Sequence, residues 1–122
     1  MSTTERGRQG EEIAAYALKA HGYEIVERNW RCPAGEIDLV ARDGEVVVFV
    51  EVKLRGSGAF GSPEEAVNEA KRARLLQAGA VYLAEHGLDD VPCRIDVVAI
   101  ELAPSGKVQR LSIHRDAVRA HG

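Results

Sequence analysis

The stretch GEIDLVARDGEVVVFVEVK, residues 35–53, decides the fold of this 122-residue chain. Apolar and β-branched runs stand before and after Asp43-Gly44, a dipeptide that favours a two-residue turn between antiparallel strands. The stretch therefore predicts a β-hairpin, with strands over residues 35–42 and 45–53.

Side chains of opposite character are expected on the two faces of this hairpin, because they alternate along a strand. One face is expected to carry Glu36, Asp38, Glu51 and Lys53. The other is expected to be wholly apolar, with Ile37, Leu39, Ala41, Val46, Val48, Val50 and Val52.

Two carboxylates of the charged face are expected to be close together. Symmetry about the turn places Glu36 opposite Glu51. Asp38 is then opposite Phe49 and diagonal to Glu51, with Cα atoms roughly 7–8 Å apart. Carboxylates at this distance repel each other unless a cation lies between them, so Asp38 and Glu51 predict a divalent metal site.

The alternative is a solvated face whose charges only keep the hairpin soluble. Against it, Val40, Val47 and Phe49 lie on the charged face, so another element is expected to cover that face in part. Covered carboxylates next to a lysine need a partner or a chemical task.

At 122 residues and 13.2 kDa the chain is expected to form one domain, residues 1–122, with its own core. Further elements are expected around the hairpin: helices over 8–21 and 62–86, and strands over 23–30, 94–102 and 107–114. A helix, three strands, a helix and two strands indicate an α/β fold, in which helices flank a mixed β-sheet.

No apolar run approaches the roughly 18 residues needed to cross a bilayer, and the first residues lack the apolar core of a signal peptide. The isolated Cys32 and Cys93 indicate neither a zinc site nor a disulfide framework. We therefore expect a cytoplasmic protein without a membrane segment, with both cysteines reduced.

The formal net charge of −3 argues against a generic nucleic-acid binder, which normally carries an excess of Lys and Arg. Without Glu11, Asp38 and Glu51, the 19 acidic residues become 16, which equals the number of Lys and Arg residues. The scaffold is then neutral apart from the candidate site, and a local basic surface is compatible with it.

Two positions on the predicted helices allow two interpretations each. Glu11 is either a charge favoured in the first turn of its helix or a site carboxylate that points toward the body of the protein. Lys71 lies within the apolar stripe of the second helix. It either buries its stem and keeps its head in water or, with Arg72 and Arg74, presents cations to a phosphate backbone.

The segment after the hairpin is rich in glycine. Residues 55–61 are expected to form either a mobile connector or a lid over the substrate, and Phe60 is the residue of interest in that segment. Ser62-Pro63 predicts the start of the second helix through a capping box. Further on, Asp96 is expected to pair with Arg94 or a neighbouring Arg rather than to act in catalysis.

Four segments carry a resemblance to a known family: Gly10-Glu11, Gly35-Glu36-Ile37-Asp38-Leu39-Val40, Glu51-Val52-Lys53-Leu54-Arg55 and Phe60-Gly61-Ser62-Pro63-Glu64. Over nearly its whole length the chain resembles the YraN-like family of predicted bacterial endonucleases, which is similar to archaeal Holliday junction resolvases. The resemblance implies a restriction-endonuclease-like fold, with an acidic residue on the first helix and a D…E-x-K set on the central hairpin. The positions of that set are filled by Glu11, Asp38, Glu51 and Lys53, and Ile37 stands where a proline is usual.

This set implies hydrolysis of a phosphodiester bond with Mg²⁺ or Mn²⁺. Asp38, Glu51 and the Val52 carbonyl are expected to hold the metal together with waters. Lys53 is expected to orient or deprotonate the attacking water and to stabilise the transition state. Glu11 is expected to complete the metal shell or to hold a water beside it.

The leading hypothesis is therefore an endonuclease that acts on DNA, including branched or structured DNA, with Arg55, Lys71, Arg72 and Arg74 on the phosphate backbone. The alternative is a non-catalytic nucleic-acid-binding or scaffold protein that keeps the nuclease fold. The intact site favours the enzyme, whereas the acidic balance of the chain favours the alternative. Cutting two strands would favour a two-fold homodimer.

Overall fold

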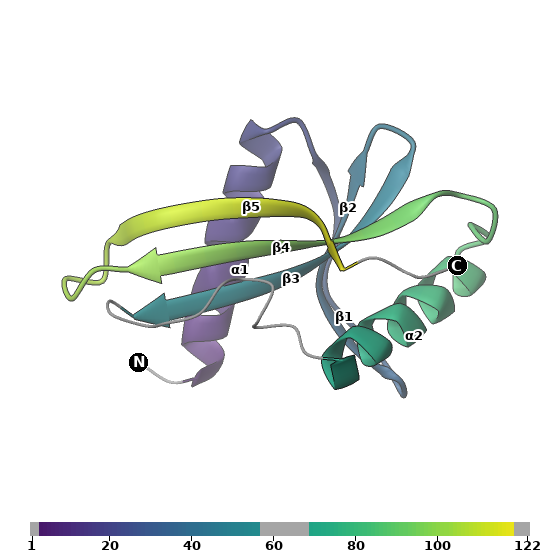
Figure 1. Cartoon of the computed structure of the whole chain (residues 1–122), viewed down its shortest axis with the longest axis horizontal. Helices are drawn as coiled ribbons and strands as arrows, with labels where there is room; N and C mark the ends of the chain where they lie inside the picture. The colour runs from purple at the N-terminus through teal and green to yellow at the C-terminus, as the bar shows by residue number, and fades with distance from the viewer. Residues whose placement is uncertain (1–2, 57–68, 119–122) are drawn as a thin grey trace.

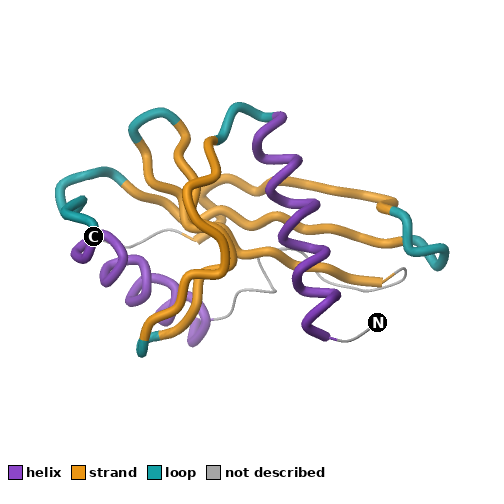
Figure 2. The backbone as a smooth tube through the Cα atoms, turned by 180° about the vertical axis from the view of Figure 1, so that it is seen from behind, coloured by secondary structure: helices purple, strands orange, loops and turns teal. Residues whose placement is uncertain are grey.

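The computed structural model describes residues 3–56 and 69–118, which form one five-stranded sheet with a helix on each face (Figure 1, Figure 2). The elements follow one another as α1 Thr3–Ala20, β1 Glu24–Cys32, β2 Gly35–Asp43, β3 Val46–Gly56, α2 Glu69–Glu85, β4 Cys93–Leu102 and β5 Val108–Val118. This order confirms the predicted α/β class and the mixed sheet flanked by helices.

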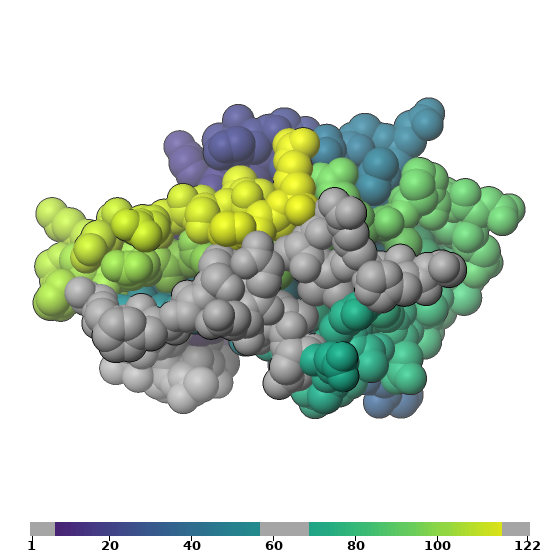
Figure 3. Space-filling model, in the orientation of Figure 1, coloured from purple at the N-terminus to yellow at the C-terminus, as the bar shows by residue number. Residues whose placement is uncertain are grey.

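The strand order in the sheet is β1-β2-β3-β4-β5, so β1 is an edge strand. Strand β5 forms the other edge and lies at the molecular surface (Figure 3). All neighbouring strands are antiparallel except β3 and β4, which are parallel. A parallel pair needs a crossover connection, and α2 belongs to the one between β3 and β4.

Both helices end at a glycine with left-handed backbone geometry. Gly22 has a φ of 90°, and the Tyr23 N–H donates to the Leu18 carbonyl at 3.0 Å, which is the pattern of a Schellman motif. Gly87, with a φ of 66°, ends α2 in the same way. Both predicted stops are therefore confirmed.

The turn between β2 and β3 is displaced by one residue from its predicted place. Asp43 pairs with Val46, so the turn consists of Gly44-Glu45 and not of Asp43-Gly44. Gly44 has a φ of 62°, and a type II′ turn favours Gly with positive φ at its first central position. The preference of glycine for that position decides the displacement.

The strand register shifts by two as a result. Phe49 pairs with Val40, so the predicted opposition of Phe49 to Asp38 is wrong, and so is the diagonal placement of Asp38 and Glu51. The β2–β3 ladder ends at the Leu39–Val50 pair, and both carboxylates follow directly beyond it. A shift of two preserves the alternation of side chains, so Asp38 and Glu51 still share one face and one cavity.

Two hydrophobic clusters fill the faces of the sheet. The cluster on the α1 side consists of Ala14, Ala15, Leu18, Tyr23, Leu39, Ala41, Val48, Val50, Val98, Ile100 and Leu102. The cluster on the α2 side consists of Ile37, Val40, Val47, Phe49, Leu75, Ala78, Tyr82, Leu83 and Ile95. Helix α2 therefore covers the apolar part of the charged face, as expected.

Ile37 departs from its predicted face. It packs with Phe49 on the α2 side and not with Leu39 on the α1 side. In β1 its partner is Trp30, and the preceding Asn29 has a positive φ of 56°. Two-stranded ribbons twist more strongly than wide sheets, and β1 and β2 form such a ribbon beyond the end of the β2–β3 ladder. This local twist breaks the regular alternation at Ile37.

Two expectations fall on residues 57–68, which lie outside the described residues. They are the glycine-rich lid with Phe60 and the capping-box start at Ser62-Pro63. Neither described helix has the length and apolarity needed to cross a membrane.

Candidate active site

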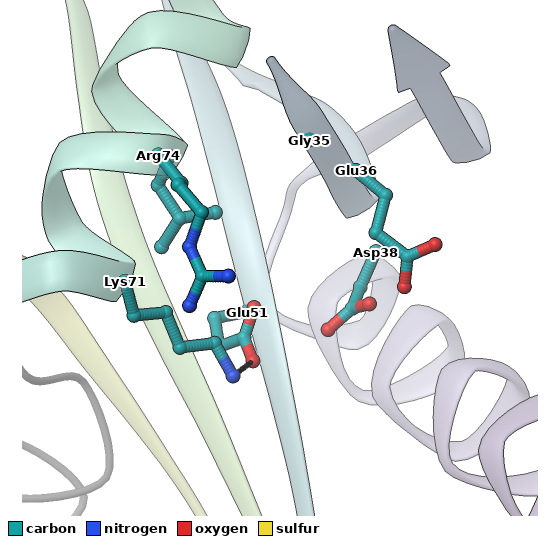
Figure 4. Close-up of a pocket in the computed structure, with 7 residues that line it drawn as sticks. Gly35, Glu36, Asp38, Glu51, Lys71 and Arg74 are labelled. Carbon is teal, nitrogen blue, oxygen red and sulfur yellow. Dashed lines mark ion pairs between the residues drawn. The ribbon is translucent and has the colours of Figure 1, made fainter. Parts of the chain in front are cut away.

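A cavity of about 360 Å³ opens between α2 and the end of the β2–β3 ladder (Figure 4). Its lining residues are Gly35, Glu36, Asp38, Glu51, Lys71, Arg74 and Leu75. Glu36 and Asp38 of β2 stand on one side of it, and Glu51 of β3 stands on the other side with Lys71 and Arg74 of α2 (Figure 4). Acidic and basic groups of three elements thus share one cavity.

Asp38 is held where β2 and β3 part. Its Oδ2 atom accepts a hydrogen bond from the Val52 N–H at 2.8 Å, two residues beyond the last β2–β3 pair. Burial, followed by the negative charge of Glu51, raises the pKa of Asp38 to about 7, although the bond from Val52 opposes this shift. The site therefore favours either a proton or a cation on this carboxyl group.

Glu51 is the most enclosed acidic group of the cavity, with a side chain that is 7% exposed. Lys53 Nζ lies 3.4 Å from its Oε1 atom, and Lys71 Nζ contacts the same oxygen. Burial, together with the nearby Lys71 amino group, lowers the pKa of Lys53. For Lys71 the contact with Glu51 outweighs burial and raises the pKa. Two lysines of different elements thus converge on one buried carboxylate.

Glu11 reaches this neighbourhood from α1. A Cβ atom at the preceding Gly10 would lie 3.5 Å from Val52 Cγ1, so α1 packs closely against β3 at this point. Burial and then the charge of Glu36 raise the pKa of Glu11, and its own charge acts on Asp38. Because α1 begins at Thr3, Glu11 does not lie in the first turn of its helix, so that interpretation is wrong, and a role in the site stays a prediction.

Several charged residues beside the cavity had no predicted role. Arg31 Nε lies 3.2 Å from Glu36 Oε2, and Arg8, Arg28 and Arg31 all lie close enough to Glu11 to lower its pKa. The sequence pattern could have identified Glu36 as a site residue, because strand alternation puts Glu36 and Asp38 on the same charged face. No sequence pattern could have identified the arginines of β1, because their approach to Glu11 depends on how α1 packs.

The carboxylates suit a hard divalent cation. Magnesium is usually bound through one or two carboxylates, with waters and substrate phosphate completing its shell. Asp38 and Glu51 supply two carboxylates to one cavity, where Glu51 already binds the ammonium cations of Lys53 and Lys71. Across residues 3–56 and 69–118, no group of three or more His, Cys, Asp or Glu side chains is arranged to hold a metal. The cavity therefore fits a metal site with two carboxylate ligands, in which the backbone and water supply the other oxygen ligands.

The other predicted residues are not among those that line this cavity. Arg55, half-buried at the end of β3, pairs in register with Glu101 of β4, and Arg72 is half-buried on α2. Asp96, fully buried, binds Arg94 Nε at 3.0 Å and accepts the Tyr23 hydroxyl at 2.8 Å. The prediction that Asp96 is an ion-pair partner of Arg94 is confirmed.

Comparison with known proteins places the chain among related bacterial sequences. A UPF0102 protein of Beutenbergia cavernae is 60% identical over 94 residues, which cover 77% of this chain and 80% of that protein. One from Moorella thermoacetica is 46% identical over 117 residues, with 96% and 98% covered, and one from Symbiobacterium thermophilum is 50% identical over 103 residues, with 84% and 87% covered. The family model described as "Uncharacterised protein family UPF0102" matches residues 10–100, so the chain belongs to the UPF0102 family.

Proposed function

We propose that this protein is a divalent-metal-dependent endonuclease that hydrolyses phosphodiester bonds in DNA. The observation that carries the proposal is that Asp38, Glu51 and Lys71 line one cavity and that Lys53 contacts Glu51 beside it. The resemblance of the chain to the YraN-like family supports the same chemistry. The proposal includes a cytoplasmic location, where a bacterial enzyme would meet DNA.

The charge of each residue indicates its role in the proposed reaction. Asp38, Glu51 and the Val52 carbonyl would hold Mg²⁺ or Mn²⁺, which when bound supplies positive charge to the phosphate and lowers the pKa of water. Lys53 lies beside Glu51 with a lowered pKa, so it is suited to orient the attacking water and to accept its proton. The water oxygen bonds to phosphorus, one ester P–O bond breaks, and the released oxygen takes up a proton.

The charge around the cavity supports an anionic substrate. The carboxylates there are Glu11, Glu36, Asp38 and Glu51, and the cations are Arg8, Arg28, Arg31, Lys53, Lys71 and Arg74. Cations of four elements thus lie beside these carboxylates, although the whole chain carries a net charge of −3. We propose that Lys71, Arg72 and Arg74 on α2, with Arg55 at the end of β3, bind the phosphate backbone.

A second candidate is a non-catalytic nucleic-acid-binding or scaffold protein that keeps the nuclease fold. The net charge of −3 favours it, because an enzyme that binds DNA unaided normally has a basic surface overall. If the protein is an endonuclease that cuts both strands of a branched or duplex substrate, we propose that it acts as a homodimer. The scaffold candidate does not require a dimer.

Metal titration combined with cleavage assays tests the proposal. Binding to the folded state raises the melting temperature with metal concentration, so Mn²⁺ should stabilise the wild type and should fail to stabilise Asp38→Asn and Glu51→Gln. Single-stranded, duplex, flapped and four-way DNA are then assayed for cleavage with each metal. An equal thermal response in all three proteins would remove the metal site. Metal binding without cleavage of any substrate would favour the scaffold.

A further inference from the structure

Lys71 reaches Glu51 from outside the hairpin on which the site is built. Lys53 belongs to the same strand as Glu51, whereas Lys71 extends from α2 to the same Oε1 atom, on the side of the cavity that faces Asp38 (Figure 4). The side chain of Glu51 is 7% exposed and that of Lys71 is 27% exposed. The carboxylate is therefore enclosed, while the ammonium group stands at the open side of the site.

The contact between these two groups conflicts with metal binding at Glu51. A divalent cation coordinated by this carboxylate would stand beside the ammonium group of Lys71, and like charges at contact distance in a partly buried site repel strongly. Both lysines have a flexible stem, but Lys71 makes the shorter contact with Glu51 Oε1, whereas Lys53 Nζ lies 3.4 Å from it. Lys71 is thus the cation that a metal at Glu51 would displace.

We propose that Lys71 occupies Glu51 in the metal-free protein, that a divalent cation displaces it, and that the displaced ammonium group then binds a phosphate oxygen of the substrate. The proposal rests on the proposed function, because it uses the same metal site and the same class of substrate. Arg74 lines the same cavity from α2, so a phosphate that enters there meets cations on the wall from which Lys71 extends. Metal and substrate then raise each other's binding affinity, because the metal binds Glu51 and the phosphate binds Lys71.

The displacement is tested by the affinity for Mn²⁺ alone, measured by calorimetry on the full chain. Removing the competing cation in Lys71→Met and Lys71→Gln should tighten Mn²⁺ binding roughly tenfold, whereas Lys71→Arg should remain near the wild type. Arg74→Met is the matched control, because it removes a positive charge from the same helix and cavity and should change the affinity less than about threefold. Circular dichroism checks that each variant is folded.

Cleavage supplies the second readout. At saturating Mn²⁺, Lys71→Met should cut more slowly than the wild type although it binds the metal more tightly, a combination that a merely structural role would not produce. Equal Mn²⁺ affinity in the wild type and both neutral variants, including no binding by any of them, overturns the displacement. A wild type that cuts nothing while Lys71→Met still binds Mn²⁺ more tightly overturns the nuclease function and leaves the displacement supported.

Discussion

The protonation state of Asp38 depends on the immediate surroundings of its carboxyl group. Burial and the charge of Glu51 set the pKa of Asp38 to about 7 in the folded protein, against 3.8 for the exposed group. The folded state therefore binds this proton more tightly than the unfolded state does. The stability that Asp38 contributes is then present at low pH and is lost as the pH rises from about 4 to about 7.

Asp38→Asn should remove this loss, because an amide keeps the shape of the protonated carboxyl and can still accept the Val52 N–H. In EDTA at pH 8 the variant should be more stable than the wild type by about 1–3 kcal/mol, and near pH 4 the difference should vanish. Urea unfolding across this range measures it. Asp90→Asn, in the exposed turn after α2, is the control and should follow the wild type. Parallel pH profiles for Asp38→Asn and the wild type would contradict the raised pKa.

Lys53 is expected to act on the reaction and not on the fold. Lys53→Met should retain the fold and Mn²⁺ binding but should lower the rate of cleavage by roughly 10²–10⁴, because it removes the group that acts on the water and the transition state. Gel cleavage assays are paired with DNA affinity measurements. Lys107→Met removes an exposed lysine from the β4–β5 turn and should cut normally. Wild-type cleavage by Lys53→Met on every substrate would show that the E-x-K assignment is wrong.

Close helix packing at the element scale depends on two glycines in different ways. Gly79 of α2 lies against Phe49, and a Cβ atom there would stand 2.7 Å from Phe49 Cε2. That ring is fixed in the core by an edge-on contact with Tyr82, with ring centroids 5.9 Å apart. At Gly10 of α1, a Cβ atom would make an ordinary contact with Val52 Cγ1 at 3.5 Å.

The same substitution should therefore have opposite effects at the two sites. Replacing Gly by Ala stabilises a helix by about 1 kcal/mol, while overpacking a core costs about 1–3 kcal/mol. Gly79→Ala should lower the free energy of unfolding by about 1 kcal/mol, and Gly10→Ala should raise it by up to about 1 kcal/mol. Chemical denaturation measures both. If Gly10→Ala lowered the free energy of unfolding as much as Gly79→Ala does, the ordinary contact expected between a Cβ atom at Gly10 and Val52 would be contradicted.

The distribution of charge over the whole molecule is compatible with the proposed anionic substrate of an acidic chain. The net charge is −3, yet Lys71 and Arg74 of α2 line the cavity, and arginines of α1 and β1 lie close enough to Glu11 to lower its pKa. Association with DNA should therefore depend on this local surface and decrease steeply with salt.

Replacing Lys71, Arg72 and Arg74 by Gln should weaken DNA binding to a similar extent for all sequences. The slope of log affinity against log salt should become shallower by about one for each phosphate that the variant no longer neutralises. Fluorescence anisotropy over a salt series measures the slope. Lys19→Gln, in the last turn of α1, is the control and should leave it unchanged. An unchanged slope in the triple variant would place the DNA-binding surface elsewhere.

The sequence by itself determined the order of the elements, the central hairpin and the shared face of Asp38 and Glu51. These features are local, because strand alternation has a period of two and survives the two-residue shift in register that followed from the Gly44-Glu45 turn. The helix stops were predictable for the same reason, since a glycine after the last turn acts through its own backbone geometry.

Only the tertiary structure decided which groups meet at the cavity. The contact of Lys71 with Glu51 depends on how α2 lies across the sheet, and the approach of Glu11 depends on the packing of α1 against β3. The face of Ile37 depends on the twist of the β1–β2 ribbon. Each of these results from packing between elements distant in sequence, where complementary surfaces and not a residue pattern set the position. Periodicity could therefore identify the carboxylates of the site but not the second lysine that binds them.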